Sequence, residues 1–422
     1  MKKSTSKISS RFKKILNALG PGLITGASDD DPSGIATYSQ AGAAFGFATL
    51  WTTLITFPLM ASVQQMCARI GLVTAAGLTR TLKKNYPKSI LYLMILFSFP
   101  AITLNIGADI QGMGSVANLI VPEVPVFAFS LLFTALLIFF IIRYPYQKIA
   151  AVLKWLSIVL FLYILVPFLV KPNWSEVFKN TFIPTIHFDK AFFSILVAIL
   201  GTTISPYLFF WQATMEAEDM NHSVKKVVVN KRILDNMKLD VDIGMLFSNI
   251  VMFFIILTAG SVLYKAGIHQ IDSVGQAAKA LEPLTGKFAY LLFAVGVMGT
   301  GFLAIPVLAG SLSYIMAETF DWEEGLDKKF HEAKGFYITI VISLLIGLSL
   351  DFLGISPMKA LLYTAILYGL TAPVMIAIIL HICNNKKVMG EFTNNRWINF
   401  FGSVTLVLMT ASAIALIYFQ FT

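Results

Sequence analysis

Three consecutive aspartates, Asp29 to Asp31, stand inside a stretch of sequence that is otherwise apolar enough to cross a membrane. One charge at the centre of a bilayer already costs about 3 kcal/mol on insertion scales, so three carboxylates have no inexpensive place in lipid. Pro32 and Gly34 follow directly, and both favour an interruption of the helix. A broken helix at membrane depth is tolerated where it lines a cavity, so we expect its carboxylate and carbonyl oxygens to form a cation site.

A second interruption is predicted five spans later, near Thr203 to Tyr207, where Ser205 precedes Pro206. Two interrupted helices in corresponding positions of two halves are the best sequence indication of a transporter binding site. Because five is an odd number of spans, the second half is expected to be inverted in the membrane. We expect Asp31 to point into the first break, with three further residues completing an oxygen shell: Ser28, Thr202 and Ser205. Shells of oxygen alone suit hard cations such as Mg²⁺, Ca²⁺ and Mn²⁺.

The other intramembrane acids are open to more than one interpretation. Asp29 and Asp30 either lie at the mouth of the break, in water, or contact the ion. Asp109, alone in the third predicted span, is a proton carrier, a second ion ligand, or an acid hydrogen-bonded to Asn105 or Gln111. The N-termini of the half-helices carry partial positive charge and could also hold an organic carboxylate. A transporter of amino acids or small organic acids is therefore the alternative to a cation transporter.

The composition predicts a polytopic membrane protein with one transmembrane domain. Hydrophobic residues make up 57% of the 422 residues and charged residues only 13%, whereas about a quarter of a soluble domain is charged. Residues 1–14 are expected to form a basic cytoplasmic tail and residues 15–422 a single transporter domain. Its inverted repeats are expected over about 15–170 and 191–382. Eleven spans are predicted at about residues 15–47, 49–72, 89–117, 125–142, 149–170, 191–216, 241–264, 286–319, 334–352, 356–382 and 397–420.

Basic residues determine the expected orientation. With the N-terminus inside, most of the 32 lysines and arginines fall on the cytoplasmic side, and the C-terminus lies outside after eleven spans. The same distribution explains the net charge of +9 without nucleic acid as a partner. The sequence has no nucleophile–base arrangement, phosphate loop or redox motif, so we expect neither an enzyme nor a bound cofactor. The lipid bilayer is the expected surrounding, and no obligate protein partner is implied.

At its polar motifs the chain resembles the Nramp (natural resistance-associated macrophage protein) family of divalent metal transporters, in particular a divergent bacterial branch close to the Nramp-related magnesium transporters. The resemblance covers nearly the whole chain and rests on four motifs: Gly20-Pro21-Gly22, Asp31-Pro32-Ser33-Gly34, Asn105-Ile106-Gly107-Ala108-Asp109 and Thr203-Ile204-Ser205-Pro206-Tyr207. It implies an all-α, leucine-transporter-like fold: two inverted five-helix repeats plus an eleventh helix, with helices 1 and 6 broken. It also implies import of a divalent metal (the Mn²⁺, Mg²⁺ and Fe²⁺ class) across the plasma membrane of a bacterium by alternating access.

The resemblance also implies which residues bind the metal between the two breaks. Asp31 matches the aspartate that the family uses as a ligand, and the family's backbone carbonyl ligands fall at Ser28 and Thr202. The acid of the family's third helix corresponds to Asp109. These positions would keep the charged and carbonyl part of the ligand set.

Other positions depart from the family. Gly34 stands for an asparagine, Ser205 for a methionine, Tyr207 for a histidine and Ala365 for a glutamine, while only Lys334 lies near the place of two arginines in helix 9. Because a thioether selects softer metals, its loss removes a filter against Mg²⁺ and Ca²⁺. The smaller side chains leave room for water, which suits Mg²⁺ because it dehydrates reluctantly. Proton coupling stays open, and the candidates for a proton or second-ion relay are Asp109, Asp30, Asp29 and Tyr207.

Overall fold

The computed structural model describes residues 20–145, 148, 160, 162–222 and 229–421. The predicted tail over residues 1–14 and most of the predicted fifth span lie outside this part of the chain.

All regular elements among the described residues are helices. The long helices and the half-helices are α2 (Pro21–Asp29), α3 (Pro32–Phe45), α4 (Trp51–Thr74), α6 (Lys88–Ile120), α7 (Val126–Arg143), α9 (Leu162–Val170), α11 (Lys190–Thr203), α12 (Pro206–His222), α13 (Lys231–Ala259), α16 (Ala289–Phe320), α17 (Lys334–Leu348), α18 (Pro357–Asn384) and α20 (Arg396–Phe421).

Short elements lie between these helices or extend their ends. They are α5 (Leu78–Asn85), α10 (Trp174–Phe182), η2 (Gly260–Tyr264), α14 (Val274–Ala278), η3 (Lys279–Leu281), α15 (Glu282–Thr285), η4 (Gly286–Phe288), η5 (Ser349–Leu353) and α19 (Lys386–Met389). η2, η4 and η5 fall within or at the ends of predicted spans. The other short elements lie where the sequence predicts connections between spans, because they are too short to appear as long apolar runs.

Eight helical segments of the described chain are long and apolar enough to cross a membrane, and each corresponds to a predicted span. They are Lys88–Ile120, Val126–Arg143, Lys190–Asn221, Lys231–Tyr264, Ala289–Phe320, Lys334–Leu353, Pro357–Asn384 and Arg396–Phe421. The predicted first span is divided between α2 and α3, the second corresponds to α4, and α9 is the described part of the fifth. The chain is therefore a multi-pass membrane protein.

The seventh span begins earlier than predicted. The apolar run suggested a start near residue 241, whereas α13 begins at Lys231. Asn230 caps the helix, since its side chain accepts a hydrogen bond from the amide of Ile233 at 3.1 Å. The charged segment therefore continues the helix beyond its apolar part and places Asp240 inside it, which matters for the packing of α2.

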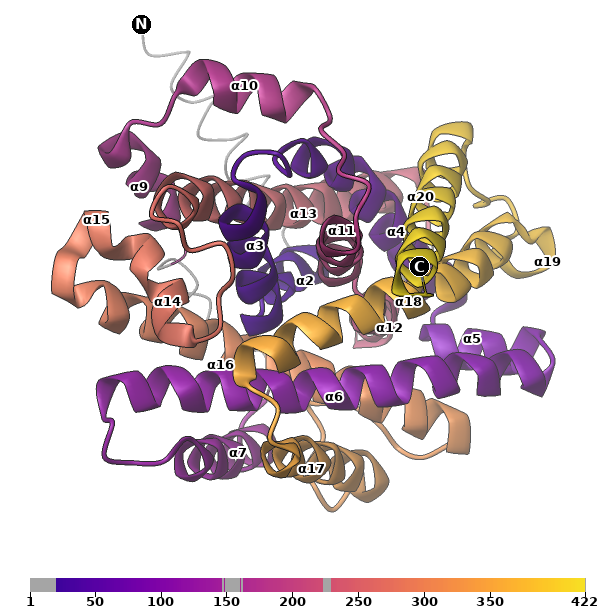
Figure 1. Cartoon of the computed structure of the whole chain (residues 1–422). Coiled ribbons are helices and arrows are strands. Elements are labelled where there is room, and N and C mark those ends of the chain that lie inside the picture. The colour runs from indigo at the N-terminus through magenta and orange to yellow at the C-terminus, as the bar shows by residue number, and fades with distance from the viewer. Residues whose placement is uncertain (1–19, 146–147, 149–159, 161, 223–228, 422) are drawn as a thin grey trace, which may run out of the picture.

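The helices form two groups with α18 passing between them. The long helix α6 packs against α7, α16 and α17, and Figure 1 shows these four helices together in the lower part of the molecule. The half-helices α2 and α3 pack against α13, and α12 packs against α4, in the other group. α18 contacts α6 on one side and α3 and α11 on the other. Both interrupted spans therefore lie in the interior, close to α18 and α6.

Close contact between α2 and α13 depends on two glycines. A Cβ atom on Gly26 would lie 2.1 Å from the carbonyl oxygen of Gly244, a distance that no side chain could occupy. Small residues allow helix backbones to approach in this way inside membranes. The tight contact covers the segment that carries the three aspartates.

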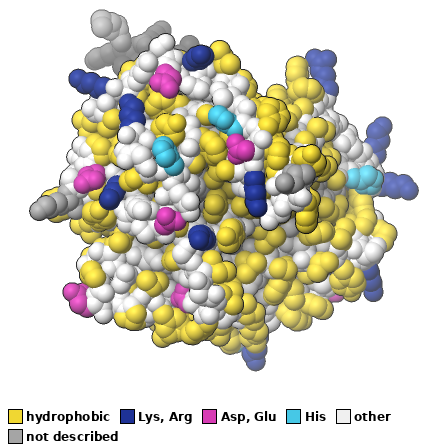
Figure 2. Space-filling view, viewed as in Figure 1, with side chains coloured by type: hydrophobic (Ala, Val, Ile, Leu, Met, Phe, Trp, Pro, Cys, Tyr) yellow, Lys and Arg dark blue, Asp and Glu magenta, His cyan; other side chains and the backbone are white. Residues whose placement is uncertain are grey.

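Large apolar side chains cover much of the outer surface. Figure 2 shows them over the lower and right-hand parts of one face, where α6, α7, α17 and α18 lie in Figure 1. Exposed examples are Leu96, Phe139, Ile346 and Tyr363. An apolar exterior of this kind is expected of helices that face lipid rather than water.

Candidate metal site between two helix breaks

The first break lies at Asp30 and Asp31, between α2 and α3. Pro32 is the first residue of α3, a position at which proline is tolerated because that amide has no helical partner. Asp31 caps this half-helix: its Oδ1 atom accepts a hydrogen bond from the amide of Gly34 at 2.7 Å. The prediction that the first span breaks at the aspartates is confirmed.

The second carboxylate oxygen of Asp31 is held by α6. Asn105 Nδ2 donates to Asp31 Oδ2 at 3.0 Å and lies 3.5 Å from Asp109 Oδ2. All three side chains are buried. Asn105 therefore joins the predicted ligand to the lone acid of the third span, as one interpretation of Asp109 anticipated. Gln111, the other partner considered for Asp109, instead donates to the carbonyl of Ile355 at 3.1 Å.

Asp29 and Asp30 point to a different neighbour. Ser248 on α13 donates to Asp29 Oδ2 at 2.7 Å and lies 3.3 Å from Asp30 Oδ1. Both aspartates have no exposed surface. The interpretation that they lie at a water-filled mouth is therefore wrong, because the close packing of α13 on α2 covers them. Sequence reasoning missed Ser248, which is an ordinary polar residue within an apolar span.

The second break lies at Ile204 and Ser205, between α11 and α12. Pro206 is the first residue of α12, which repeats the arrangement of the first break. The Ser205 hydroxyl donates to the carbonyl oxygen of Thr202. Both oxygens are predicted ligands, and each keeps a lone pair after this hydrogen bond forms. The predicted interruption of the sixth span is confirmed.

Tyr207 connects the two breaks directly. Its hydroxyl donates to the carbonyl oxygen of Ser28 at 2.8 Å, and its ring packs against Tyr368 of α18 at 5.9 Å between centroids. A tyrosine in this place therefore contacts one of the carbonyl oxygens that the resemblance assigns to the metal. The sequence predicts a packing role or a relay role for Tyr207, and it does not predict this hydrogen bond.

Gly34 lies where the two breaks approach each other. A Cβ atom there would be 3.3 Å from the Asp29 carbonyl oxygen and 3.4 Å from Thr202 Oγ1. Because these distances are shorter than most Cβ contacts, the absence of a side chain at Gly34 lets the half-helices lie this close to each other. Beside the second break, Gly201 allows α11 to pack closely on α18, because a Cβ atom on Gly201 would lie 2.1 Å from the carbonyl oxygen of Ala365.

The donor set fits a hard cation. It combines the buried Asp31 carboxylate with neutral hydroxyl and carbonyl oxygens, the ligand types that Mg²⁺ and Mn²⁺ accept. Two nearby buried oxygens, Ser28 Oγ and Asn105 Oδ1, have no hydrogen-bond partner in the described structure. Such oxygens keep acceptor capacity that a bound ion or its water could use. Within the described residues there is no group of three or more His, Cys, Asp or Glu side chains that could hold a metal ion.

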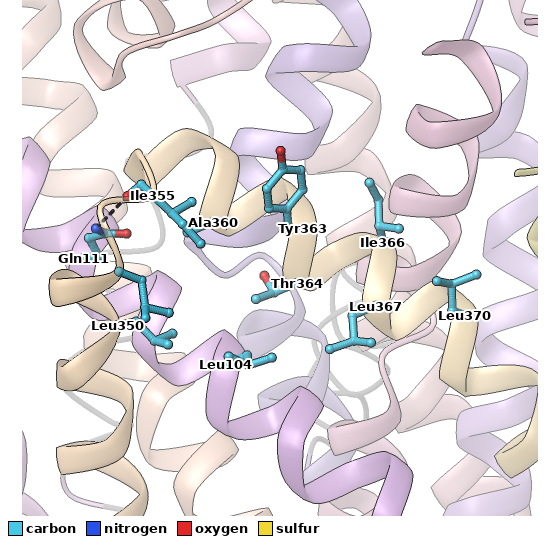
Figure 3. Close-up of a pocket in the computed structure, with 11 residues that line it drawn as sticks. Leu104, Gln111, Leu350, Ile355, Ala360, Tyr363, Thr364, Ile366, Leu367 and Leu370 are labelled. Carbon is cyan, nitrogen blue, oxygen red and sulfur yellow. Dashed lines mark hydrogen bonds between the residues drawn. The ribbon is translucent and has the colours of Figure 1, made fainter. Parts of the chain in front are cut away.

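Two cavities approach this region. One, of about 310 Å³, lies between α3, α11 and α18 and extends from Phe45 to Ala36, with Gln40, His269 and Asp272 among its polar lining residues. The other, of about 380 Å³, lies between α6 and α18 and is lined mainly by apolar side chains (Figure 3). The first of these, called the polar cavity below, reaches Ala36, about one helical turn from Pro32. The second reaches Thr364, whose hydroxyl lies 3.4 Å from that of Ser33.

The chain is similar to known transporters in both sequence and structure. A transporter named "Divalent metal cation transporter MntH" from Caldanaerobacter subterraneus is 26% identical over 391 residues, covering 91% of this chain and 88% of that protein. The structure of a manganese transporter from Eremococcus coleocola, solved in complex with an aromatic bis-isothiourea substituted compound, has a TM-score of 0.74. It is 19% identical and covers 96% of this chain and 87% of that chain.

The fold is also found in a more distant structure. MhsT in complex with L-phenylalanine has a TM-score of 0.60 at 14% identity, covering 93% of this chain and 98% of that chain. The predicted leucine-transporter-like fold is confirmed by these structures. The family model for natural resistance-associated macrophage protein-like proteins matches residues 22–419. The chain therefore belongs to the Nramp family.

Proposed function

We propose that this protein is a divalent metal cation transporter that imports its substrate by alternating access. The observation that carries the proposal is the buried Asp31 carboxylate at the first break, which Tyr207 of the second half-helix pair joins through its hydrogen bond to the Ser28 carbonyl. The name of the relative from Caldanaerobacter subterraneus supports the same substrate class. The expected location is the plasma membrane of a bacterium, with the N-terminus inside and the C-terminus outside.

Asp31 is the principal ligand in this proposal. The Ser28 and Thr202 carbonyls and the Ser205 hydroxyl are the lesser ligands, and Gly34 shapes the break. Because none of these groups is a sulfur or nitrogen donor, the site favours hard or partly hydrated ions, with Mn²⁺ and Mg²⁺ as leading substrates and Fe²⁺ in the same class. Asp109, Asp30, Asp29 and Tyr207 are the proposed relay for protons or a second ion.

A transporter of amino acids or small organic acids is less well supported. Such a substrate would place its carboxylate at the free N-terminus of a half-helix. At α3 that position is already taken, because Asp31 itself caps the helix through the Gly34 amide. A second carboxylate there would be repelled by the first.

Uptake into proteoliposomes tests the proposal. Purified protein is reconstituted and supplied with Mn²⁺, Mg²⁺ or a mixture of radiolabelled amino acids, each with and without a pH gradient. Saturable uptake of a divalent metal, without uptake of amino acids, is the expected result. Amino-acid uptake that is independent of divalent metal would overturn the proposal, and the pH-gradient arm decides whether protons are coupled.

A further inference from the structure

The N-terminus of half-helix α2 is capped by a side chain from another span. Asp240 on α13 accepts three backbone hydrogen bonds: from the amides of Gly20 at 2.8 Å, Gly22 at 2.7 Å and Leu23 at 3.2 Å. Asp240 is buried, with 2% of its surface exposed. No side chain of α2 supplies this cap itself. The first turn of α2 therefore depends on α13 for the partners of its free amides.

The cap is stronger than a neutral contact. A carboxylate at the positive end of a helix dipole accepts charge-assisted hydrogen bonds when it is ionised, and these are stronger than neutral ones. On an adjacent face, Thr25 of α2 donates to Gln212 of α12, and Gln212 donates to Glu216 at 3.0 Å. These polar contacts and the Gly26–Gly244 approach fix α2 against α13 and α12.

The position of α2 controls one side of the candidate site. The half-helix ends at Asp29, directly beside the first break, and carries the Ser28 carbonyl. Moving it away from α13 would therefore uncover the site and withdraw one of its oxygens in the same step. On the other side of the break the polar cavity between α3, α11 and α18 already reaches to Ala36. The structure thus combines an approach from the α3 side with closure on the α2 side.

We propose that Asp240 is a positioning residue of the transport cycle: its three hydrogen bonds hold α2 in the closed position, and their loss opens the cytoplasmic side. This inference rests on the proposed transport function and orientation. It requires two states of α2 whose balance a single contact can shift.

Cysteine accessibility measures the position of α2. A reporter variant, Ser28→Cys, replaces a buried hydroxyl that has no hydrogen-bond partner. Membrane-impermeant maleimide is applied to right-side-out and inside-out vesicles. The native Cys67 and Cys383 are fully buried, so their labelling reports unfolding rather than movement of α2.

The test variant is Asp240→Asn and the matched control is Asp242→Asn. Asp242 lies two residues further along α13 and accepts from Gln65 of α4 rather than from α2. We expect Asp240→Asn to raise labelling of the reporter from the cytoplasmic side by about tenfold, which corresponds to about 1.4 kcal/mol. Labelling from the outer side should not rise, and the control should leave both rates unchanged.

An unchanged cytoplasmic rate in Asp240→Asn, or an equal rise from both sides, overturns the inference. Labelling of the native cysteines in Asp240→Asn would show that this variant unfolds. Asp240→Glu is then labelled in its place, because it keeps the carboxylate but displaces it from the α2 amides by one methylene. A folded Asp240→Glu protein without raised cytoplasmic labelling then contradicts the inference. Labelling does not depend on the substrate. Metal uptake is measured separately, in the unmodified protein. An unshifted labelling rate in Asp240→Asn therefore refutes the role of Asp240 alone, and absence of metal uptake by the unmodified protein refutes the proposed substrate alone.

Discussion

The two helix breaks share one construction but differ in chemistry. Each has two non-helical residues followed by a proline that begins the next half-helix, at Pro32 and at Pro206. The residue before the proline is an aspartate in the first break and a serine in the second. Asp31 is held by donors, the Gly34 amide and the Asn105 amide group. Ser205 instead donates its own hydrogen bond to the Thr202 carbonyl.

This difference indicates a division of roles. The first break supplies the negative charge that attracts a cation, and its neighbours are arranged to stabilise that charge. The second break supplies neutral oxygens that shape the site without adding charge. If this division is correct, removing a charge from the first break or adding one to the second should change metal uptake or stability more than altering a neutral contact.

Removal of the charge from the first break should have the largest effect. Asp31→Asn keeps the shape of the side chain, but a neutral amide attracts the metal far less. We expect metal uptake in proteoliposomes to fall by about a hundredfold, since truncating one charge of a buried pair typically costs 2–5 kcal/mol. Asp235→Asn, at an exposed position near the start of α13, is the control and should transport normally. Uptake by Asp31→Asn at the rate of the unmodified protein would refute the assignment of the ligand.

A second carboxylate in the second break should destabilise the metal-free protein. Ser205→Asp buries another charge near Asp31 and removes the donor to Thr202, with an expected loss of about 3 kcal/mol in the free energy of unfolding. Thermal unfolding in detergent, with chelator and with Mg²⁺, measures this. Added Mg²⁺ should raise the melting temperature of the variant more than that of the unmodified protein, because it neutralises the added charge. Equal shifts would mean that residue 205 does not face the ion.

Loss of the tyrosine bridge should have a smaller effect. Tyr207→Phe removes the hydrogen bond to the Ser28 carbonyl and should cost about 1 kcal/mol in the free energy of unfolding. Tyr368→Phe is the matched control, since that ring packs against Tyr207 but its hydroxyl has no partner in the described structure. Equal losses of stability in the two variants would show that the hydrogen bond from Tyr207 to Ser28 does not stabilise the protein.

A substitution in the second break should alter the selectivity among metal ions more than the rate of metal uptake. Ser205→Met places a thioether where the Nramp resemblance expects one and should shift preference from Mg²⁺ toward Mn²⁺ and Cd²⁺ by about tenfold or less. Competition between these ions for uptake gives the ratio, and Ser205→Ala separates loss of the hydroxyl from gain of sulfur. An unchanged ratio in Ser205→Met would count against the thioether argument.

The sequence was most informative where a residue type conflicted with its surroundings. Charges and prolines within apolar runs predicted both breaks and the role of Asp31 as the residue that enters the first one. Contacts between distant helices could not be predicted in this way. Ser248, Asn105 and Asp240 become partners of the first span only after α6 and α13 have packed against it. The burial of Asp29 and Asp30 has the same origin, because it follows from the close approach of α13.

The central claim is that a divalent metal binds between the two breaks with Asp31 as its charged ligand. Anomalous X-ray scattering from crystals grown with Mn²⁺ tests this most directly. We predict one peak at about 2.1–2.4 Å from an Asp31 carboxylate oxygen, close to the Ser28 and Thr202 carbonyls, and no such peak in Asp31→Asn. A peak remote from Asp31, or one that persists in Asp31→Asn, would contradict the account.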